Sequence, residues 1–361
     1  MTGGDGAPTA ELVVVFEELR RRFRGFPAPA DDKRFDPSHA SQEELLYYGL
    51  PPRPDPRSQP RVYEAWQRGF GQPLTLNSFA FTIAQLSELG YRPYFREEAL
   101  VQRPSRYVAS LNWSGAYLAA NRFKKFMQIW GIWTVPNNLQ QVPVPPAVKL
   151  RPFNCSVWIG LDGQRRYLNS SLPQIGTTST YDATAPGNTV AQAWTQWWDR
   201  ENPQETLPVP MPLAVDPGNE VLSVLTAVSP RHVHLVMVNL SQGKAIAVWA
   251  SSPSVTLDNG RVVPLEISGA TAEWIVERPM IPGGNDLSNL PDYPPTEFDA
   301  CLALEADDVN IFFLPTARTQ VLQSERLIRM YEVEETAQRI SFISMPHRKS
   351  ETSVRMTHGD F

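Results

Sequence analysis

From Tyr107 onward the chain consists of short runs of β-branched and aromatic residues separated by turn-forming residues. The tripeptides D-P-G at 216–218, S-Q-G at 241–243 and D-N-G at 258–260 are typical of turns between strands, and Asn-Gly predicts a tight hairpin. Many short strands without intervening helices pair mainly with their sequence neighbours. The pattern therefore predicts an all-β fold, an antiparallel sandwich or barrel.

The first 105 residues differ, because their apolar residues recur at helical spacing. This periodicity predicts helices over 11–24, 61–69 and 78–90. We therefore divide the chain into a mostly helical N-terminal extension, 1–105, and a β-sandwich domain, 106–361.

Two further segments of the extension carry local structural signals. Ser41 and Glu44 have the spacing of a capping box, in which each side chain accepts a hydrogen bond from the other's backbone N–H, and predict the start of a further short helix. The Pro-rich segment 51–60 cannot donate enough backbone hydrogen bonds to join a sheet, and is expected to be an extended, exposed linker.

Composition limits the classes of partner. Charged residues make up 20% of the chain and the formal net charge is −5, which offers no broad attraction for nucleic acid. The sequence has no basic leader followed by an apolar run and no apolar stretch long enough for a membrane span. We expect a monomeric protein that binds neither nucleic acid nor membrane. Its localisation is left open: the absence of a visible signal favours the cytoplasm.

Cysteine and histidine spacing does not indicate a metal site. Cys155 and Cys301 are expected to be buried thiols, although one disulfide between them is possible in principle. His232 and His234 share a strand face, but no third ligand accompanies them and a structural role is the better interpretation. We expect neither a metal nor another cofactor.

The segment 271–277, T-A-E-W-I-V-E, combines charge with strand-forming residues. A period of two places Glu273, Ile275 and Glu277 on one face of the strand, and Trp274 on the other. Strands contain few Glu residues unless that face meets water or a site. Taken alone, the segment is better interpreted as a solvent-facing strand than as part of a site.

A second strand, at 193–199, is rich in tryptophan. The same period of two places Trp194, Gln196 and Trp198 on one face and Trp197 on the other, so these indoles cannot all face one core. Aromatic side chains with polar tips are typical of clefts that bind peptides or sugars.

Seven short blocks, taken in order, resemble the glutamic peptidases, or eqolisins. The blocks are N-W-S-G-A at 112–116, W-T-V-P at 133–136, W-I-G-L-D-G at 158–163, P-Q-I-G at 173–176, A-W-T-Q-W-W at 193–198, N-L-S-Q-G at 239–243 and A-E-W-I-V-E at 272–277. The resemblance implies a concanavalin A-like, or lectin-like, antiparallel β-sandwich with its active site on a concave face. It also implies an endopeptidase that acts on polypeptides at acidic pH. The alternative from another class is a non-catalytic lectin-like module that binds carbohydrate or peptide.

The resemblance implies a catalytic pair, Gln174 and Glu277. Glu277 would act as the general base that activates water, and Gln174 would stabilise the oxyanion. We expect the two side chains to share one water molecule. Glu273 lies on the same strand face as Glu277 and is expected to raise its pKa if both are dry.

The resemblance also implies a substrate cleft lined by Trp113, Trp194 and Trp198, together with Gln196 and Glu273. Packing within the sandwich is the alternative role for the three indoles.

Two departures from the family pattern affect substrate preference and pH optimum. Gln196 replaces a carboxylate that is common in the family, and Thr178 stands where an Asp usually follows the catalytic Gln. The chain also has 33 Lys and Arg residues, which argues against operation in extreme acid. Because family members are made with propeptides, residues 1–105 are either a removable segment, cut within 51–60, or a permanent layer.

Overall fold

The fold is known from a computed structural model, which describes residues 34–48, 50–82, 107–144, 151–164, 171–181, 189–199, 207–256, 260–281, 286–310, 316–334 and 339–359. Two helices and twenty strands lie within these ranges. The helices are α2 (Gln42–Tyr47) and α3 (Pro60–Phe70). The strands are β1 (Arg34–Phe35), β2 (Leu74–Thr82), β3 (Tyr107–Ser110), β4 (Trp113–Ala119), β5 (Lys125–Thr134), β6 (Phe153–Leu161), β7 (Ser171–Tyr181), β8 (Thr189–Asp199), β9 (Val209–Pro210), β10 (Glu220–Ser229), β11 (His232–Asn239), β12 (Lys244–Ser251), β13 (Ser254–Thr256), β14 (Val262–Pro264), β15 (Thr271–Glu277), β16 (Thr296–Ala306), β17 (Arg318–Gln320), β18 (Arg326–Glu334), β19 (Arg339–Ser350) and β20 (Ser353–His358).

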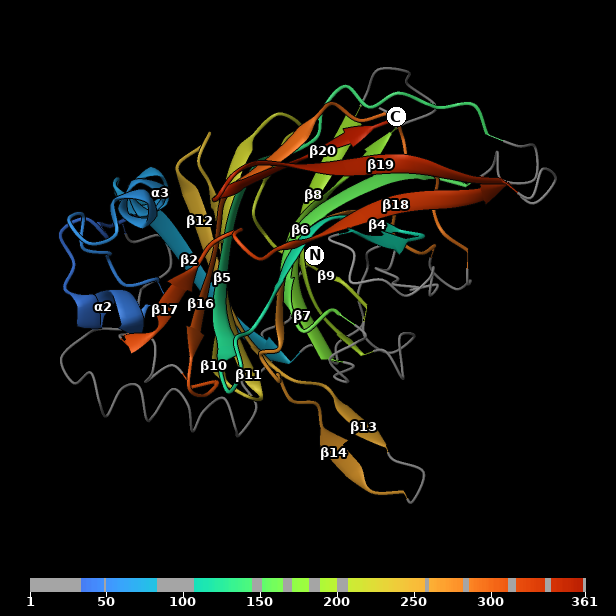
Figure 1. Cartoon of the computed structure of the whole chain (residues 1–361). Coiled ribbons are helices and arrows are strands. Elements are labelled where there is room, and N and C mark those ends of the chain that lie inside the picture. The colour runs from blue at the N-terminus through green and yellow to red at the C-terminus, as the bar shows by residue number, and fades with distance from the viewer. Residues whose placement is uncertain are drawn as a thin grey trace.

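The strands form one continuous sheet that bends back on itself, apart from the separate β13–β14 hairpin. In its first half the order is β1-β2-β12-β11-β10-β5-β16. In its second half it is β20-β19-β18-β4-β15-β6-β7-β8-β9, and β16 joins the halves by pairing with both β5 and β20. Figure 1 shows the halves as two curved layers. The prediction of a mostly β protein is confirmed, although a shared strand connects what was expected to be two separate sheets.

Three clusters of buried side chains follow from alternation along these strands. The largest lies between the two halves and includes Trp133, Ile159 and Trp274. A second covers the outer face of the first half, and a third covers the outer face of the second half. Because β6 and β15 turn alternate residues toward the first and third clusters, both faces of the second half are buried.

The N-terminal region is only partly as predicted. Helices α2 and α3 confirm the short helix after Ser41 and the helix over 61–69, and the Ser41–Glu44 capping box forms, with N···O distances of 2.7 and 3.1 Å. The helix expected over 78–90 is wrong for residues 78–82, which belong to strand β2. Parallel pairing with the edge strand β12 overrides the local helical pattern there. The remainder of that segment and the helix expected over 11–24 lie outside the described residues.

The described part of the extension is joined to the sandwich. Trp66 and Phe70 of α3 pack with Trp130 and Leu222 on the outer face of the first half of the sheet. In Figure 1 the two helices lie outside that half, on the side of the sandwich away from β7 and β8. The expected boundary at residues 105 and 106 falls among residues that the structure does not describe.

The Pro-rich segment 51–60 is exposed over 55–60, as predicted, whereas its first residues are held by these helices. The indole of Trp66 donates to the carbonyl of Pro51 at 3.0 Å. Arg53 exchanges two hydrogen bonds with the side chain of Gln42 and donates to the carbonyls of Pro37 and Ala40. Proline prevents sheet pairing here, as predicted, but side chains from both helices supply the missing partners.

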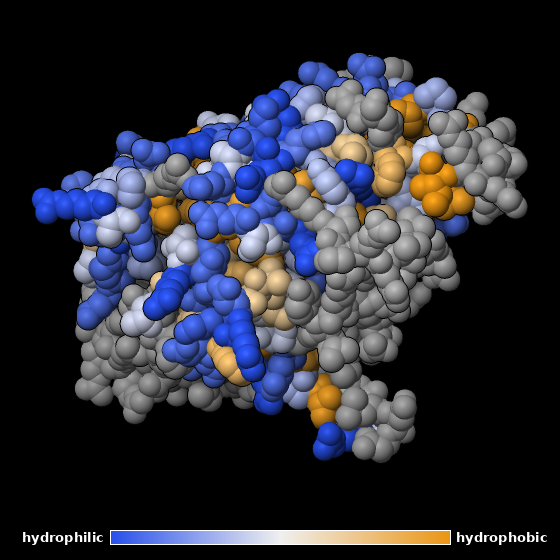
Figure 2. Space-filling view, viewed as in Figure 1, coloured by the Kyte–Doolittle hydropathy of each residue, from blue (hydrophilic) through white to orange (hydrophobic). Residues whose placement is uncertain are grey.

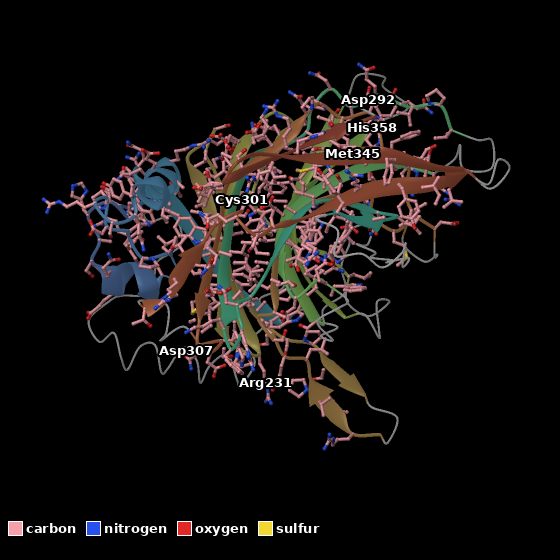
Figure 3. The ribbon with its side chains drawn as sticks, viewed as in Figure 1. Arg231, Asp292, Cys301, Asp307, Met345 and His358 are labelled. Atoms are coloured by element: carbon pink, nitrogen blue, oxygen red, sulfur yellow. The ribbon has the colours of Figure 1, made fainter. Side chains whose placement is uncertain are left out.

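The remaining expectations concern cysteines, surface and membrane. Cys155 and Cys301 are both buried free thiols, and burial raises the pKa of each. Figure 3 shows Cys301 within the body of the sandwich. On the face drawn in Figure 2, hydrophilic residues dominate and hydrophobic ones occur in small groups. Among the described residues, no helix is long and apolar enough to cross a membrane.

Candidate active site

The sequence-predicted site residues lie on the outer face of the second half of the sheet, which we call the site face. Pairing across β8, β7, β6, β15 and β4 aligns its residues in rows. The first row is Gln196, Gln174, Gly160, Glu273 and Tyr117; the middle row is Trp194, Gly176, Trp158, Ile275 and Gly115; the second row is Gln192, Thr178, Ser156, Glu277 and Trp113. Paired residues point to the same side of a sheet, and so do residues two apart on one strand.

Gln174 and Glu273 lie in the first row on either side of Gly160. Both side chains are fully buried. The amide nitrogen of Gln174 donates to Oε1 of Gln196 at 2.8 Å, which fixes the orientation of the carboxamide. Within the described part of the chain, Oε1 of Gln174 and Oε2 of Glu273 are buried without a hydrogen-bond partner of ordinary geometry. This row therefore presents two unmet acceptor atoms, from strands β7 and β15 on either side of β6.

The environment of Glu273 strongly perturbs the pKa of its carboxyl group. Burial raises its pKa well above the usual range, and the nearby charge of Asp162 adds to the increase. The nearby Thr271 hydroxyl and the backbone N–H groups of Gly163 and Gln164 act in the opposite direction, although among the described residues only the Gly163 N–H forms a hydrogen bond of ordinary geometry with the carboxyl group. Oε1 accepts the bond from the Gly163 N–H at 3.1 Å. The result is a carboxyl group suited to exchange a proton nearer neutral pH than an exposed Glu.

Glu277, in the second row, is held by protein donors through both oxygens. Oε1 accepts a hydrogen bond from the Asn112 amide at 2.9 Å, and Oε2 accepts one from the Trp158 indole at 2.7 Å. The same row contains the Ser156 and Thr178 hydroxyls, 2.6 Å apart. The position at which the family usually has Asp thus carries a hydroxyl bonded to its neighbours.

The structure does not place Glu277 beside Gln174. The first and second rows are four residues apart, and the two side chains are also separated by β6. With strands about 4.8 Å apart and a rise of about 3.4 Å per residue, their Cα atoms are roughly 16 Å apart. The Cα atoms of Gln174 and Glu273 are about 10 Å apart on the same basis. By register, Gln174 therefore lies nearer to Glu273 than to Glu277.

The predicted tryptophans share the site face. Trp113, Trp194 and Trp198 belong to its apolar cluster, along with Trp158 and Tyr117. Trp113 packs edge-on against Trp158, with ring centroids 4.8 Å apart, and the Trp194 indole donates to Thr178 at 2.9 Å. All three indoles are nearly completely buried, so each of them packs within this cluster.

Asp162 anchors the loop that leads into β15. Its carboxylate accepts hydrogen bonds from the backbone N–H groups of Ser268, Gly269 and Ala270 and from the Ser268 hydroxyl, at 2.5 to 3.2 Å. Despite these bonds, burial raises the pKa of Asp162. The loop enters β15 two residues before Glu273, so Asp162 fixes where that strand begins.

Sequence reasoning missed the parts played by Asn112, Trp158, Asp162 and Gln164. The first three lie in sequence blocks that resemble the family, so the sequence marked these positions. Their roles could not be predicted because their side-chain partners come from strands distant in sequence. Gln164 carried no signal. No group of three or more His, Cys, Asp or Glu side chains suited to a metal ion occurs among the described residues.

The described residues thus bring a buried amide, Gln174, and a buried carboxyl group, Glu273, to one face of a bent β-sandwich. The peptidase A4 family model matches residues 111–337, which include every residue of the three rows. The chain belongs to the peptidase A4 family, the eqolisins or glutamic peptidases, and is a hydrolase of peptide bonds.

Solved structures give a consistent list of similar proteins. Scytalido-glutamic peptidase with a peptide-based transition state analog is 16% identical, with 68% of this chain and 98% of that chain covered and a TM-score of 0.49. SCP-B, an eqolisin in complex with the tripeptide Ala-Ile-His, is also 16% identical, with the same coverage and a TM-score of 0.46. Aspergilloglutamic peptidase from Aspergillus niger is 19% identical, with 57% and 99% covered and a TM-score of 0.42. No curated protein matches the chain.

Proposed function

We propose that this peptidase cleaves internal bonds of polypeptides with Gln174 and Glu273 as its catalytic pair. The observation that carries the proposal is the pair of unmet acceptors in the first row, Oε1 of Gln174 and Oε2 of Glu273. A water molecule between them would donate one O–H to each, and buried waters typically satisfy such groups. The water that attacks the substrate would thus be held and oriented before substrate binds.

The chemistry follows from the two side chains. Ionised Glu273 accepts a proton as the water oxygen attacks the carbonyl carbon of the scissile bond. The Gln174 amide has two N–H donors, of which Gln196 engages one. The second can donate to the oxyanion of the tetrahedral intermediate. Glu273 then transfers its proton to the leaving nitrogen as the C–N bond breaks, which restores the carboxylate.

Glu277 receives a different role in this proposal. Its two oxygens bind Asn112 and Trp158, so it positions the indole that lies between the two rows. The catalytic role expected for Glu277 from the family resemblance is the alternative assignment, and the test below distinguishes the two.

The proposed mechanism sets the acid limit of activity. Glu273 must be ionised to accept a proton, and burial raises its pKa above the usual value of about 4.3. Activity therefore increases with pH through that raised pKa, which favours mildly acidic to neutral conditions over strong acid.

The test is cleavage of an unfolded protein by the full chain and by two matched variants. Glu273→Gln should reduce kcat by about 10²–10⁴-fold, because it removes the general base while preserving the side-chain shape. Glu277→Gln, the control, should retain kcat within about tenfold. A Glu273→Gln variant with wild-type turnover, or a Glu277→Gln variant that alone is inactive while folded, would overturn the assignment.

A further inference from the structure

The turn that follows β6 lies against both polar rows of the site face. Asp162 has a left-handed backbone, with φ of 69°, and this turns the chain out of the strand. A Cβ atom added to Gly163 would lie 2.9 Å from Cη2 of Trp113 and 3.3 Å from Cδ of Glu273. The turn therefore contacts one residue of the second row and one of the first.

This turn is held in place from both ends. The backbone N–H of Asp162 donates to the carbonyl of Thr271 at 3.1 Å, and its carboxylate binds the Ser268–Ala270 loop. The Gly163 N–H donates to Glu273. A segment fixed by this many hydrogen bonds can position the next side chain accurately.

That next side chain is Gln164, which has no assigned role. It is only 1% exposed, and neither its amide nitrogen nor its amide oxygen has a hydrogen-bond partner among the residues that the structure describes. Its backbone N–H acts on the Glu273 carboxyl, so the residue adjoins the first row. A buried amide with both polar atoms unmet destabilises the free protein, and such groups often serve a ligand. Gln128 and Gln196, which are equally buried, each have partners within the protein.

We propose that Gln164 is a substrate-binding residue that hydrogen-bonds to the polypeptide backbone next to the scissile bond. Its amide nitrogen would donate to a substrate carbonyl and its oxygen would accept a substrate N–H, the two groups that every peptide unit offers. Such a contact is independent of the substrate's side chains. This inference rests on the proposed peptidase site, and it adds a binding contact that the catalytic pair does not provide.

The test replaces Gln164 with Met, which has a similar volume but cannot form these hydrogen bonds. Gln128→Met is the matched control, because Gln128 is fully buried in the other half of the sheet and is satisfied by Thr226 and Trp130. Thermal unfolding and steady-state cleavage of an internally quenched peptide are measured for the full chain and both variants. Binding of an uncleaved peptide is measured by calorimetry in Glu273→Gln, with and without Gln164→Met.

Gln164→Met should leave Tm unchanged or higher, raise KM about tenfold and change kcat little, and weaken calorimetric binding by a similar factor. Gln128→Met should lower Tm without affecting KM. An unchanged KM and unchanged peptide affinity in Gln164→Met overturn the proposal, as does a loss of Tm equal to that of Gln128→Met. Turnover by Glu273→Gln would instead refute the catalytic pair, so the two failures are distinguishable.

Discussion

The two polar rows of the site face have similar side chains but different hydrogen-bonding states. In the second row Glu277 is satisfied by Asn112 and Trp158. In the first row Glu273 and Gln174 each retain a buried acceptor with no partner among the described residues. Satisfied polar groups stabilise a fold, whereas unmet ones cost free energy and are typical of functional sites. This difference is the basis on which we propose a structural role for the second row and a chemical role for the first.

After Glu273→Gln, the largest effect that the difference between the two rows predicts is a loss of kcat on substitution of Gln174. Gln174→Met removes the proposed oxyanion donor, and we expect kcat to fall by about 10²–10³-fold. Steady-state cleavage of a quenched peptide measures this loss. Gln128→Met controls for the loss of a buried amide elsewhere in the sheet. Equal kcat values in the two variants would remove Gln174 from the mechanism.

The next prediction concerns stability, where the two carboxyl groups should respond with opposite signs. Glu277→Gln turns an amide N–H toward either Asn112 or Trp158, both donors, so the free energy of unfolding should fall by about 1–3 kcal/mol. Glu273→Gln removes a group that is costly to ionise when buried, and should increase stability at neutral pH. Urea unfolding of both variants at several pH values measures the two changes.

The pH dependence of that difference follows from the raised pKa of Glu273. Below the unfolded-state pKa of about 4.3 the carboxyl is protonated in both states and imposes no cost. As pH rises through that value toward the raised folded-state pKa, the wild type loses stability relative to Glu273→Gln. A stability difference that is the same at pH 4 and pH 7 would show that Glu273 titrates normally.

The smallest effect is expected at the edge of the first row. Gln196→Met removes the acceptor that orients the Gln174 carboxamide at 2.8 Å. One neutral hydrogen bond contributes about 1 kcal/mol, so kcat should fall roughly fivefold with KM nearly unchanged. A loss as large as that of Gln174→Met would mean that Gln196 itself contacts the reacting groups.

Sequence patterns predicted which residues of one strand share a face, but not which residues of different strands lie in the same row. Alternation correctly placed Glu273 and Glu277 together, and Trp194, Gln196 and Trp198 together, because a strand's period depends only on its own residues. Which Glu lies in the same row as Gln174 depends on how β6 pairs with β7 and with β15. Gly160 of β6 pairs with both Gln174 and Glu273. Register arises from pairing between distant segments, and local sequence does not encode it.

The same limit explains the error in the N-terminal region. Local periodicity favoured a helix over 78–90, whereas residues up to Thr82 form β2 because the edge of β12 was available for pairing. By contrast, the capping box at Ser41 and the apolar spacing around Trp66 are local signals, and both predicted helices form.

The most direct measurement is a high-resolution crystal structure of the wild-type protein in which bound waters are visible on the site face. We predict one ordered water within hydrogen-bond distance of both Oε1 of Gln174 and Oε2 of Glu273. A water bound by Glu277 in place of Glu273, or a Gln174 side chain directed away from the first row, would contradict the assignment of the catalytic pair.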